Sequence, residues 1–180
     1  IMGSIVGASL FYFQQSSCFP QIEHTSVGAL LLIMLLGCTL LPLPLKWDVR
    51  GWTEMHPLNG PAWSLYYEYI ANILYALFIR RFNKIALTVL VVIAACFTVY
   101  RSLTAPMGDM VGGWALNWEQ QYVGFVRLMY PFFGGLLLSR LGWLIRIKKR
   151  AFWYCALIII VILSIPRLGG EEHYWMNGLY

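Results

Sequence analysis

The feature that most constrains the fold is an uninterrupted apolar run, Val27 to Leu45, that contains no charged residue. As an α-helix rising about 1.5 Å per residue, this run comes close to the roughly 30 Å thickness of bilayer hydrocarbon. Only 12% of the chain is charged, 59% is hydrophobic and the mean hydropathy is +0.65, whereas soluble domains carry roughly 25% charged residues. We therefore expect an integral membrane protein.

Further apolar blocks follow, each bounded by charges or by Gly, Pro and Asn. Lipid offers no partners for free backbone N–H and C=O groups, so spanning segments must be helices or closed barrels. Continuous apolar runs lack the alternation of barrel strands and favour helices. The sequence thus predicts an all-α fold, a polytopic transmembrane helix bundle of about five full spans plus a truncated N-terminal span. The predicted spans are Val27–Leu45, Trp63–Ile79, Ile85–Tyr100, Tyr122–Gly142 and Ala151–Leu168, with Ile1–Phe13 as the trailing part of another.

The two ends of the chain suggest a fragment. The sequence starts at Ile1 inside a helix-like pattern, and it stops after the polar segment "GGEEHYWMNGLY", which resembles a loop leading into another helix. No charged region followed by a cleavage site precedes the first apolar segment, so we do not interpret it as a secretory signal. We expect residues 1–180 to form a single membrane domain that is part of a longer one.

The basic residues are unevenly distributed. Eight of the thirteen lie in two short stretches without acids, which the positive-inside rule assigns to the cytoplasm. The intervening loop, Arg101 to Gln121, carries Asp109 and Glu119 and would face the other side. The net charge of +5 is therefore explained by basic residues that mark the cytoplasmic loops, and no nucleic-acid partner is expected. The eight residues are Arg80, Arg81, Lys84, Arg140, Arg146, Lys148, Lys149 and Arg150.

The orientation of the N-terminal half stays open. A re-entrant or interfacial piece near Pro42 and Pro44, or near Gly60 and Pro61, would change the number of membrane crossings. It would thereby change the side of the membrane that each loop faces.

The sequence lacks the common signatures of metal and nucleophile sites. The cysteines show no CxxC spacing, so neither a zinc site nor a disulfide framework is indicated, and no metal is expected. There is no GxSxG elbow, phosphate-cradling glycine loop or HExxH motif. The isolated residues are Cys18, Cys38, Cys96 and Cys155, with His24, His56 and His173.

A polar stripe marks the predicted span from Trp63. At about 100° per residue, Ser64, Glu68, Asn72 and Tyr75 fall within an arc of about 80°. Charges in membrane helices cost about 2.5–3.5 kcal/mol near the centre and normally face the bundle interior or a wet cavity. Glu68 lies about one turn from the interface, where the penalty is smaller. It is either a functional group, or a carboxylate that bonds a neighbouring helix or caps its own first turn.

Arg127 is the second intramembrane charge, within "GFVRLMYPFFGGLLLSRLG". Tyr130 lies on roughly the same face, and Gly134 would permit a close helix contact. An ion pair between Glu68 and Arg127 is geometrically possible and would relieve both burial costs. The alternative is that Arg127 snorkels to the headgroups.

Other polar and aromatic residues are better explained by structural roles than by catalysis. His56 is the one nearby general-base candidate, although loop histidines of this kind are more often solvated. Ser64 has no identifiable base partner and is better explained as a helix cap than as a nucleophile. Interfacial belts account for Trp47, Trp52, Trp114, Trp118, Trp143 and Trp153.

Two segments carry a family resemblance. "LNGPAWSLYYEYIANILYALFIRR" resembles the Trp-Ser-Leu-x-x-Glu segment of the acyltransferase 3 family, polytopic bacterial membrane proteins that O-acylate surface sugars. "FVRLMYPFFGGLLLSRLG" is similar to the family's later Arg and Phe-Phe-x-Gly-x-Leu helix, and order and separation agree. The resemblance covers most of the chain, as the middle of a longer family member.

This resemblance implies a function and a location. The protein would be a membrane-bound O-acyltransferase that moves an acyl group, commonly acetyl, from acetyl-CoA or another acyl-CoA to a hydroxyl of a carbohydrate or related acceptor. The acyl-CoA would be a co-substrate, with no bound cofactor. The protein would lie in the bacterial cytoplasmic membrane as a multi-pass protein. Acceptor, acyl chain length and oligomeric state are not predicted.

The resemblance also implies site residues. Trp63, Ser64 and Glu68 would line a central cavity, with Glu68 in a supporting catalytic role. The family's essential histidine and paired arginines have no counterpart here and are expected before Ile1. The fragment is therefore not expected to catalyse transfer alone, and its base is unassigned. An adjoining wall would be formed by Arg127, Phe132, Phe133 and Gly134, and the substrate-binding candidates are Trp63, Ser64, Asn72, Tyr75, Arg127 and Phe133.

Two other classes of protein compete with this interpretation. In a transporter or flippase, Glu68 and Arg127 would mark a substrate or proton path. The absence of discontinuous, symmetry-related spans counts modestly against transport. A structural membrane subunit is disfavoured by the polar stripe.

Overall fold

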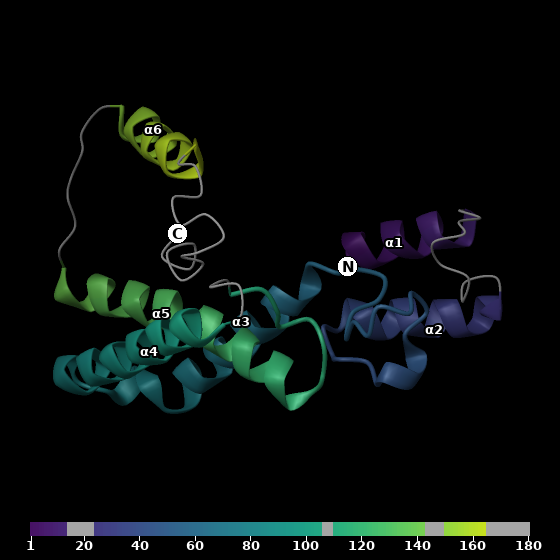
Figure 1. The fold of residues 1–180 in the computed structure, drawn as a ribbon, viewed down its shortest axis with the longest axis horizontal. Coiled ribbons are helices and arrows are strands. Elements are labelled where there is room, and N and C mark those ends of the chain that lie inside the picture. Colours follow the sequence, from purple (N-terminus) through teal and green to yellow (C-terminus); the bar gives the residue numbers. More distant parts are fainter. Residues whose placement is uncertain (14–23, 106–109, 143–149, 165–180) are drawn as a thin grey trace. The chain divides into compact units, whose positions relative to one another are not determined.

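The structure, a computed structural model, describes residues 1–13, 24–105, 110–142 and 150–164. Within these ranges it contains six α-helices and no strand, which confirms the predicted all-α fold (Figure 1). The helices are α1 (Met2–Phe13), α2 (Val27–Cys38), α3 (Ala62–Leu77), α4 (Lys84–Thr104), α5 (Trp118–Leu141) and α6 (Ala151–Ser164), with short 3-10 turns η2 (Leu45–Trp47) and η3 (Ile79–Arg81).

Helix lengths bear on the predicted spans. Among the described residues, α4 with 21 residues and α5 with 24 are long and apolar enough to cross a bilayer. Helix α3 has 16 residues, while α1, α2 and α6 have 12 to 14. The predicted count of five full spans is therefore not confirmed. The end of the last predicted span, residues 165–168, lies outside the described residues.

The predicted span Val27–Leu45 is wrong in extent, because α2 ends at Cys38. Pro42 and Pro44 follow shortly afterwards. Proline has no N–H to continue the helical ladder, and it disfavours helical geometry in the residue before it. Two prolines spaced in this way end the helix, even though the composition stays apolar.

Side-chain and backbone bonds close the end of α2. The Thr39 hydroxyl donates to the Leu36 carbonyl at 2.6 Å and accepts from the Leu41 amide at 3.3 Å. Leu40 has φ +61°, the left-handed conformation that commonly ends helices. Its amide donates to the Gly37 carbonyl at 3.3 Å. These bonds satisfy carbonyls that the helix end would leave unpaired.

The described residues fall into two compact units. The first comprises Ile1–Arg80 with Gly112–Leu128, and the second comprises Arg81–Val111 with the chain from Met129 onward. Helix α5 contributes to both. The predicted single membrane domain over residues 1–180 stays a prediction.

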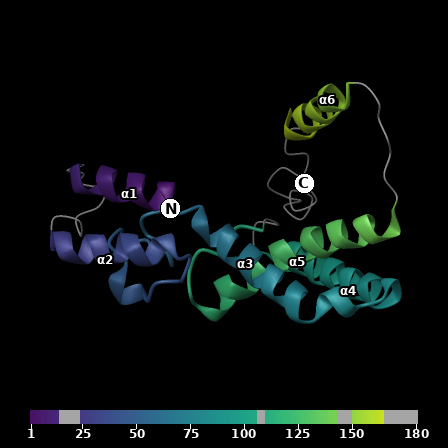
Figure 2. The ribbon, with the colours of Figure 1, turned by 180° about the vertical axis from the view of Figure 1, so that it is seen from behind.

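In the first unit, α1 and α2 lie side by side in both views (Figures 1 and 2). The segment between α2 and α3, residues 39–61, packs against them. A Cβ on Gly7 of α1 would lie 1.8 Å from the carbonyl oxygen of Leu58, so the backbone of this segment rests directly on α1. The apolar core is formed by Ala8, Leu30, Ile33, Leu43, Val49 and Leu58.

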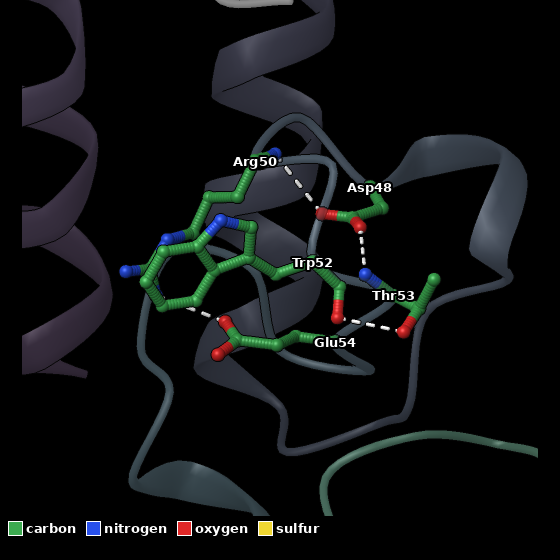
Figure 3. Close-up of polar contacts among 5 residues, drawn as sticks. All are labelled: Asp48, Arg50, Trp52, Thr53 and Glu54. Atoms are coloured by element: carbon green, nitrogen blue, oxygen red, sulfur yellow. Dashed lines mark hydrogen bonds and ion pairs between the residues drawn. The ribbon is translucent and has the colours of Figure 1, made fainter. Parts of the chain in front are cut away.

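A polar turn within this segment is held by its own side chains (Figure 3). The Asp48 carboxylate accepts from the backbone amides of Arg50, at 3.0 Å, and of Thr53. The Arg50 guanidinium pairs with Glu54 at 2.9 Å. Burial raises the pKa of Glu54, and the charge of Arg50 opposes that rise.

Arg50 also contacts two aromatic rings. Its guanidinium carbon lies 4.7 Å from the ring centroid of Trp52 and 5.3 Å from that of Phe11 in α1. Such contacts attract a cation to the ring faces. Arg50 therefore joins the turn to the first helix.

The second unit contains α4 and α6 and the later part of α5. Asn83 caps α4, accepting the amide of Ala86 at 2.8 Å. Arg140, near the end of α5, donates to the carbonyl of Phe82 just before α4.

Candidate functional site

The first predicted motif lies at the start of α3. Pro61 occupies the N-cap position and makes no side-chain capping bond. Ser64 is the third helical residue, and its hydroxyl donates to the Pro61 carbonyl at 3.1 Å. The expectation that Ser64 caps the helix is therefore wrong, because its hydroxyl serves a carbonyl of the first turn instead of a free amide.

The structure brings the first motif together with the second. In α5, the guanidinium carbon of Arg127 lies 4.7 Å from the ring centroid of Trp63. The Nη1 atom of Arg127 donates to the carbonyl of Gly112 at 3.0 Å. Arg127 is exposed and Trp63 is half-buried. A guanidinium stacked on an indole face and hydrogen-bonded to a carbonyl is fixed in orientation.

The turn that carries the Gly112 carbonyl requires glycine. Gly112 has φ +140° and Gly113 has φ +105°, conformations that L side chains rarely adopt. A Cβ on Gly113 would lie 3.0 Å from the Cα of Gly124 and 3.1 Å from the Trp63 ring. The missing side chains allow the turn to approach both α3 and α5.

Side chains at the start of α5 hold this turn from one side. Gln120 Oε1 accepts from the Gly113 amide at 2.7 Å, and Gln121 Nε2 donates to the Ala115 carbonyl at 2.9 Å. Sequence reasoning missed these residues, although the Gly-Gly pair close before a helix start was a signal for a special turn.

The segment after α2 holds the turn from the other side. The Met55 amide donates to the Trp114 carbonyl at 2.7 Å, and the Met55 carbonyl accepts from the Leu43 amide at 2.9 Å. Met55 is fully buried. The position of Gly112 thus depends on residues far away in the sequence.

The contacts among Trp63, Arg127, Gly112 and Gly113 form one cluster. Glu68 does not join this cluster through an ion pair. Its side chain is exposed, and within the described ranges its carboxylate pairs with no basic group. The suggested pair with Arg127 is therefore not formed, since Arg127 engages Trp63 and Gly112. Asn72 is exposed and donates to the Glu68 backbone carbonyl at 2.8 Å, while Tyr75 is half-buried.

Tyr67 is the buried polar residue of α3, and sequence reasoning missed it. Its side chain is 0% exposed. A Cβ on Gly124 would lie 2.2 Å from the Tyr67 ring, so α5 needs a glycine where this ring packs. The phenolic oxygen is buried and has no hydrogen-bond partner among the described residues.

His56 is buried, so its interpretation as a solvated loop histidine is wrong. It is 3% exposed, and its Nε2 lies 3.3 Å from the Leu40 carbonyl, the contact of an Nε2–H tautomer. Burial lowers its pKa. The Nδ1 atom is buried without a partner among the described residues. A cavity of about 10 Å³, lined in part by His56, Ser4 and Asn59, has room for one water molecule.

The remaining predicted site residues belong to the second unit. Phe133 is 2% exposed and packs edge-on against Phe132, with ring centroids 5.4 Å apart. A Cβ on Gly134 would meet no atom within 4 Å among the described residues, so the expected close contact at this glycine is not seen.

A larger cavity of about 540 Å³ lies between α2 and the segment that follows it. It contains none of the predicted site residues, and its lining includes Ser26, Lys46 and Asp48. Across the described residues, no cluster of three His, Cys, Asp or Glu side chains suited to a metal ion is present.

Comparison with known proteins identifies the family. A family model described as an acyltransferase domain matches residues 3–180. No curated protein and no solved structure matches the chain. The family and the long apolar helices α4 and α5 together indicate a membrane protein. Because the match extends over nearly the whole sequence, the chain belongs to the acyltransferase 3 family, a family of acyltransferases.

Proposed function

We propose that this chain is part of a multi-pass O-acyltransferase of the bacterial inner membrane. It transfers an acyl group, in the first instance acetyl, from acyl-CoA to a hydroxyl of a carbohydrate or related acceptor. The observation that carries the proposal is the family match over residues 3–180. Acyl-CoA is a co-substrate in this proposal, and no bound cofactor or metal takes part.

The contact between Trp63 and Arg127 supports this proposal. It joins the two sequence segments that carry the family resemblance, at 4.7 Å. An exposed guanidinium fixed by an indole and by the Gly112 carbonyl is suited to binding phosphate, which acyl-CoA carries. We assign Arg127 to a negatively charged group of a substrate and Trp63 to the orientation of Arg127.

The exposed carboxylate of Glu68 suits a supporting role at the acceptor. In the reaction, the acceptor hydroxyl attacks the thioester carbon, a C–O bond forms and the C–S bond breaks. A base takes the hydroxyl proton, and the departing CoA thiolate is protonated. Glu68 would bind acceptor hydroxyls or orient the base, which this chain does not identify. Ser64, Asn72, Tyr75 and Phe133 remain substrate-binding candidates.

The test uses membranes that contain the full-length protein and radiolabelled acetyl-CoA. Transfer of label to surface glycan is expected, with a lower initial rate for Glu68→Gln at an unchanged protein level. Unlabelled glycan combined with movement of solute or lipid across the membrane would support a transporter instead. Full transfer by a correctly folded Glu68→Gln protein would remove Glu68 from the mechanism.

A further inference from the structure

Tyr67 has a buried hydroxyl to which the mechanism above gives no role. The side chain is 0% exposed, and the phenolic oxygen finds no hydrogen-bond partner among the described residues. Buried hydroxyls are normally paired, because a protein partner must replace the water that is lost. The unpaired oxygen therefore needs a physical explanation.

The position of the hydroxyl connects it to the candidate site. The Tyr67 ring packs edge-on against Trp63 and Phe125, with centroids 6.1 and 5.1 Å away. A Cβ on Gly124 would lie 2.2 Å from the Tyr67 ring carbons and 2.5 Å from the phenolic oxygen, so the hydroxyl end of the ring packs against Gly124 of α5. Gly113 also packs against Gly124, because a Cβ on Gly113 would lie 3.0 Å from the Gly124 Cα and 3.1 Å from the Trp63 ring. The hydroxyl therefore lies within the cluster that holds Arg127.

Packing alone does not require this hydroxyl. A phenylalanine would make the same ring contacts without an unpaired buried oxygen, and such an oxygen lowers the stability of the folded state. A hydroxyl kept in this position without a protein partner is explained if a bound molecule supplies its hydrogen bond.

We propose that Tyr67 is a hydrogen-bond donor to the carbonyl oxygen of the transferred acyl group, an inference that rests on the proposed function. A phenol with an ordinary pKa of about 10 keeps its proton near neutral pH and can donate. When the acceptor hydroxyl attacks the thioester carbon, the carbonyl oxygen gains negative charge, and it returns to a carbonyl as the C–S bond breaks. Tyr67 keeps its proton throughout and stabilises the charged oxygen.

The hydroxyl is closed off from solvent in this structure. The acyl group must therefore displace the half-buried neighbour Phe125 to reach it, while Trp63 keeps its contact with Arg127. Exclusion of water around the reacting carbonyl strengthens the hydrogen bond and suppresses hydrolysis of the thioester.

The experiment compares Tyr67→Phe with Tyr69→Phe in the full-length protein. Tyr69 lies on the same helix and is 59% exposed, so it controls for loss of a phenol. Initial rates are measured over a range of radiolabelled acetyl-CoA concentrations with cell-surface glycan as acceptor, and thermal unfolding is followed in parallel. Removal of one oxyanion donor costs about a hundredfold or more in rate. We expect Tyr67→Phe to lower the maximal rate by about a hundredfold with little change in KM, while Tm stays constant or rises.

The possible outcomes separate the two proposals. If the wild-type protein and Tyr67→Phe transfer label at the same maximal rate, the inference about Tyr67 is wrong and the proposed function stands. If Tyr67→Phe lowers Tm, the hydroxyl holds a structural water, and the inference is overturned whether or not the rate falls. If the wild-type protein transfers no label, the proposed function fails first.

Discussion

At the scale of single residues, glycines determine how closely α3, α5 and the turn before α5 approach one another. Gly124 faces the Tyr67 ring, and a Cβ there would lie 2.2 Å from it. We expect Gly124→Ala to destabilise the protein by about 1–3 kcal/mol through overpacking. Gly28→Ala is the matched control, because Gly28 is also helical and a Cβ there meets nothing within 4 Å. Measured by chemical denaturation, the free energy of unfolding should fall only for Gly124→Ala. Equal losses in both variants would contradict the contact between Gly124 and Tyr67.

His56 gives a prediction about pH. Its folded-state pKa is lowered by burial from a usual value of 6.5. The unfolded chain therefore binds the proton first as pH falls, so the free energy of unfolding decreases below about pH 6.5 until the folded protein also binds it. Glu54 has a raised pKa and titrates with the opposite sign, so it favours the folded state at acid pH.

The measurement for His56 is therefore a difference. Stability is compared between pH 7.5 and 5.5 for the wild-type protein and His56→Gln, which leaves the Glu54 contribution in both. The wild-type protein should lose more stability on acidification. Parallel pH profiles would show that His56 is not buried as a neutral side chain.

At the scale of elements, the segment between α2 and α3 behaves as a packed part of the first unit. Arg50 is held within its polar turn by Glu54 and Trp52, and it joins this turn to α1 through Phe11. Removal of one partner leaves a partly buried charge behind, at a cost of about 1–3 kcal/mol. We expect Arg50→Gln and Glu54→Gln each to destabilise by that amount and the double variant to cost less than their sum. Additive losses in a thermal or chemical unfolding experiment would mean that the pair is not coupled.

The same elements show what a sequence can predict. Helices α3 to α6 begin close to the first residues of the corresponding predicted spans. These starts could be predicted because apolar runs with polar boundaries are local signals. The end of α2 was missed, since composition outweighed Pro42 and Pro44 in the prediction. The bond from Met55 to Trp114 could not be predicted, because it joins segments far apart in the sequence.

At the scale of the whole molecule, the family and part of the candidate site could be predicted from two motifs. Trp63 and Arg127 come into contact, whereas Glu68 is exposed and forms no ion pair with Arg127. The roles of Gly113 and of Tyr67, which occupies an unspecified position of the first motif, could not be predicted, because they depend on close approach and burial that only the packed helices create.

The measurement that tests the central claim most directly is a double-mutant cycle on Trp63 and Arg127 in the full-length protein. Transfer of label from acetyl-CoA to glycan is measured for Trp63→Leu, Arg127→Gln and both together, alongside Tm. If these residues act as one unit, each single variant should lower the rate by about tenfold or more, and the double variant should fall little further. Wild-type rates in both folded single variants would contradict the assignment of this cluster to acyl transfer.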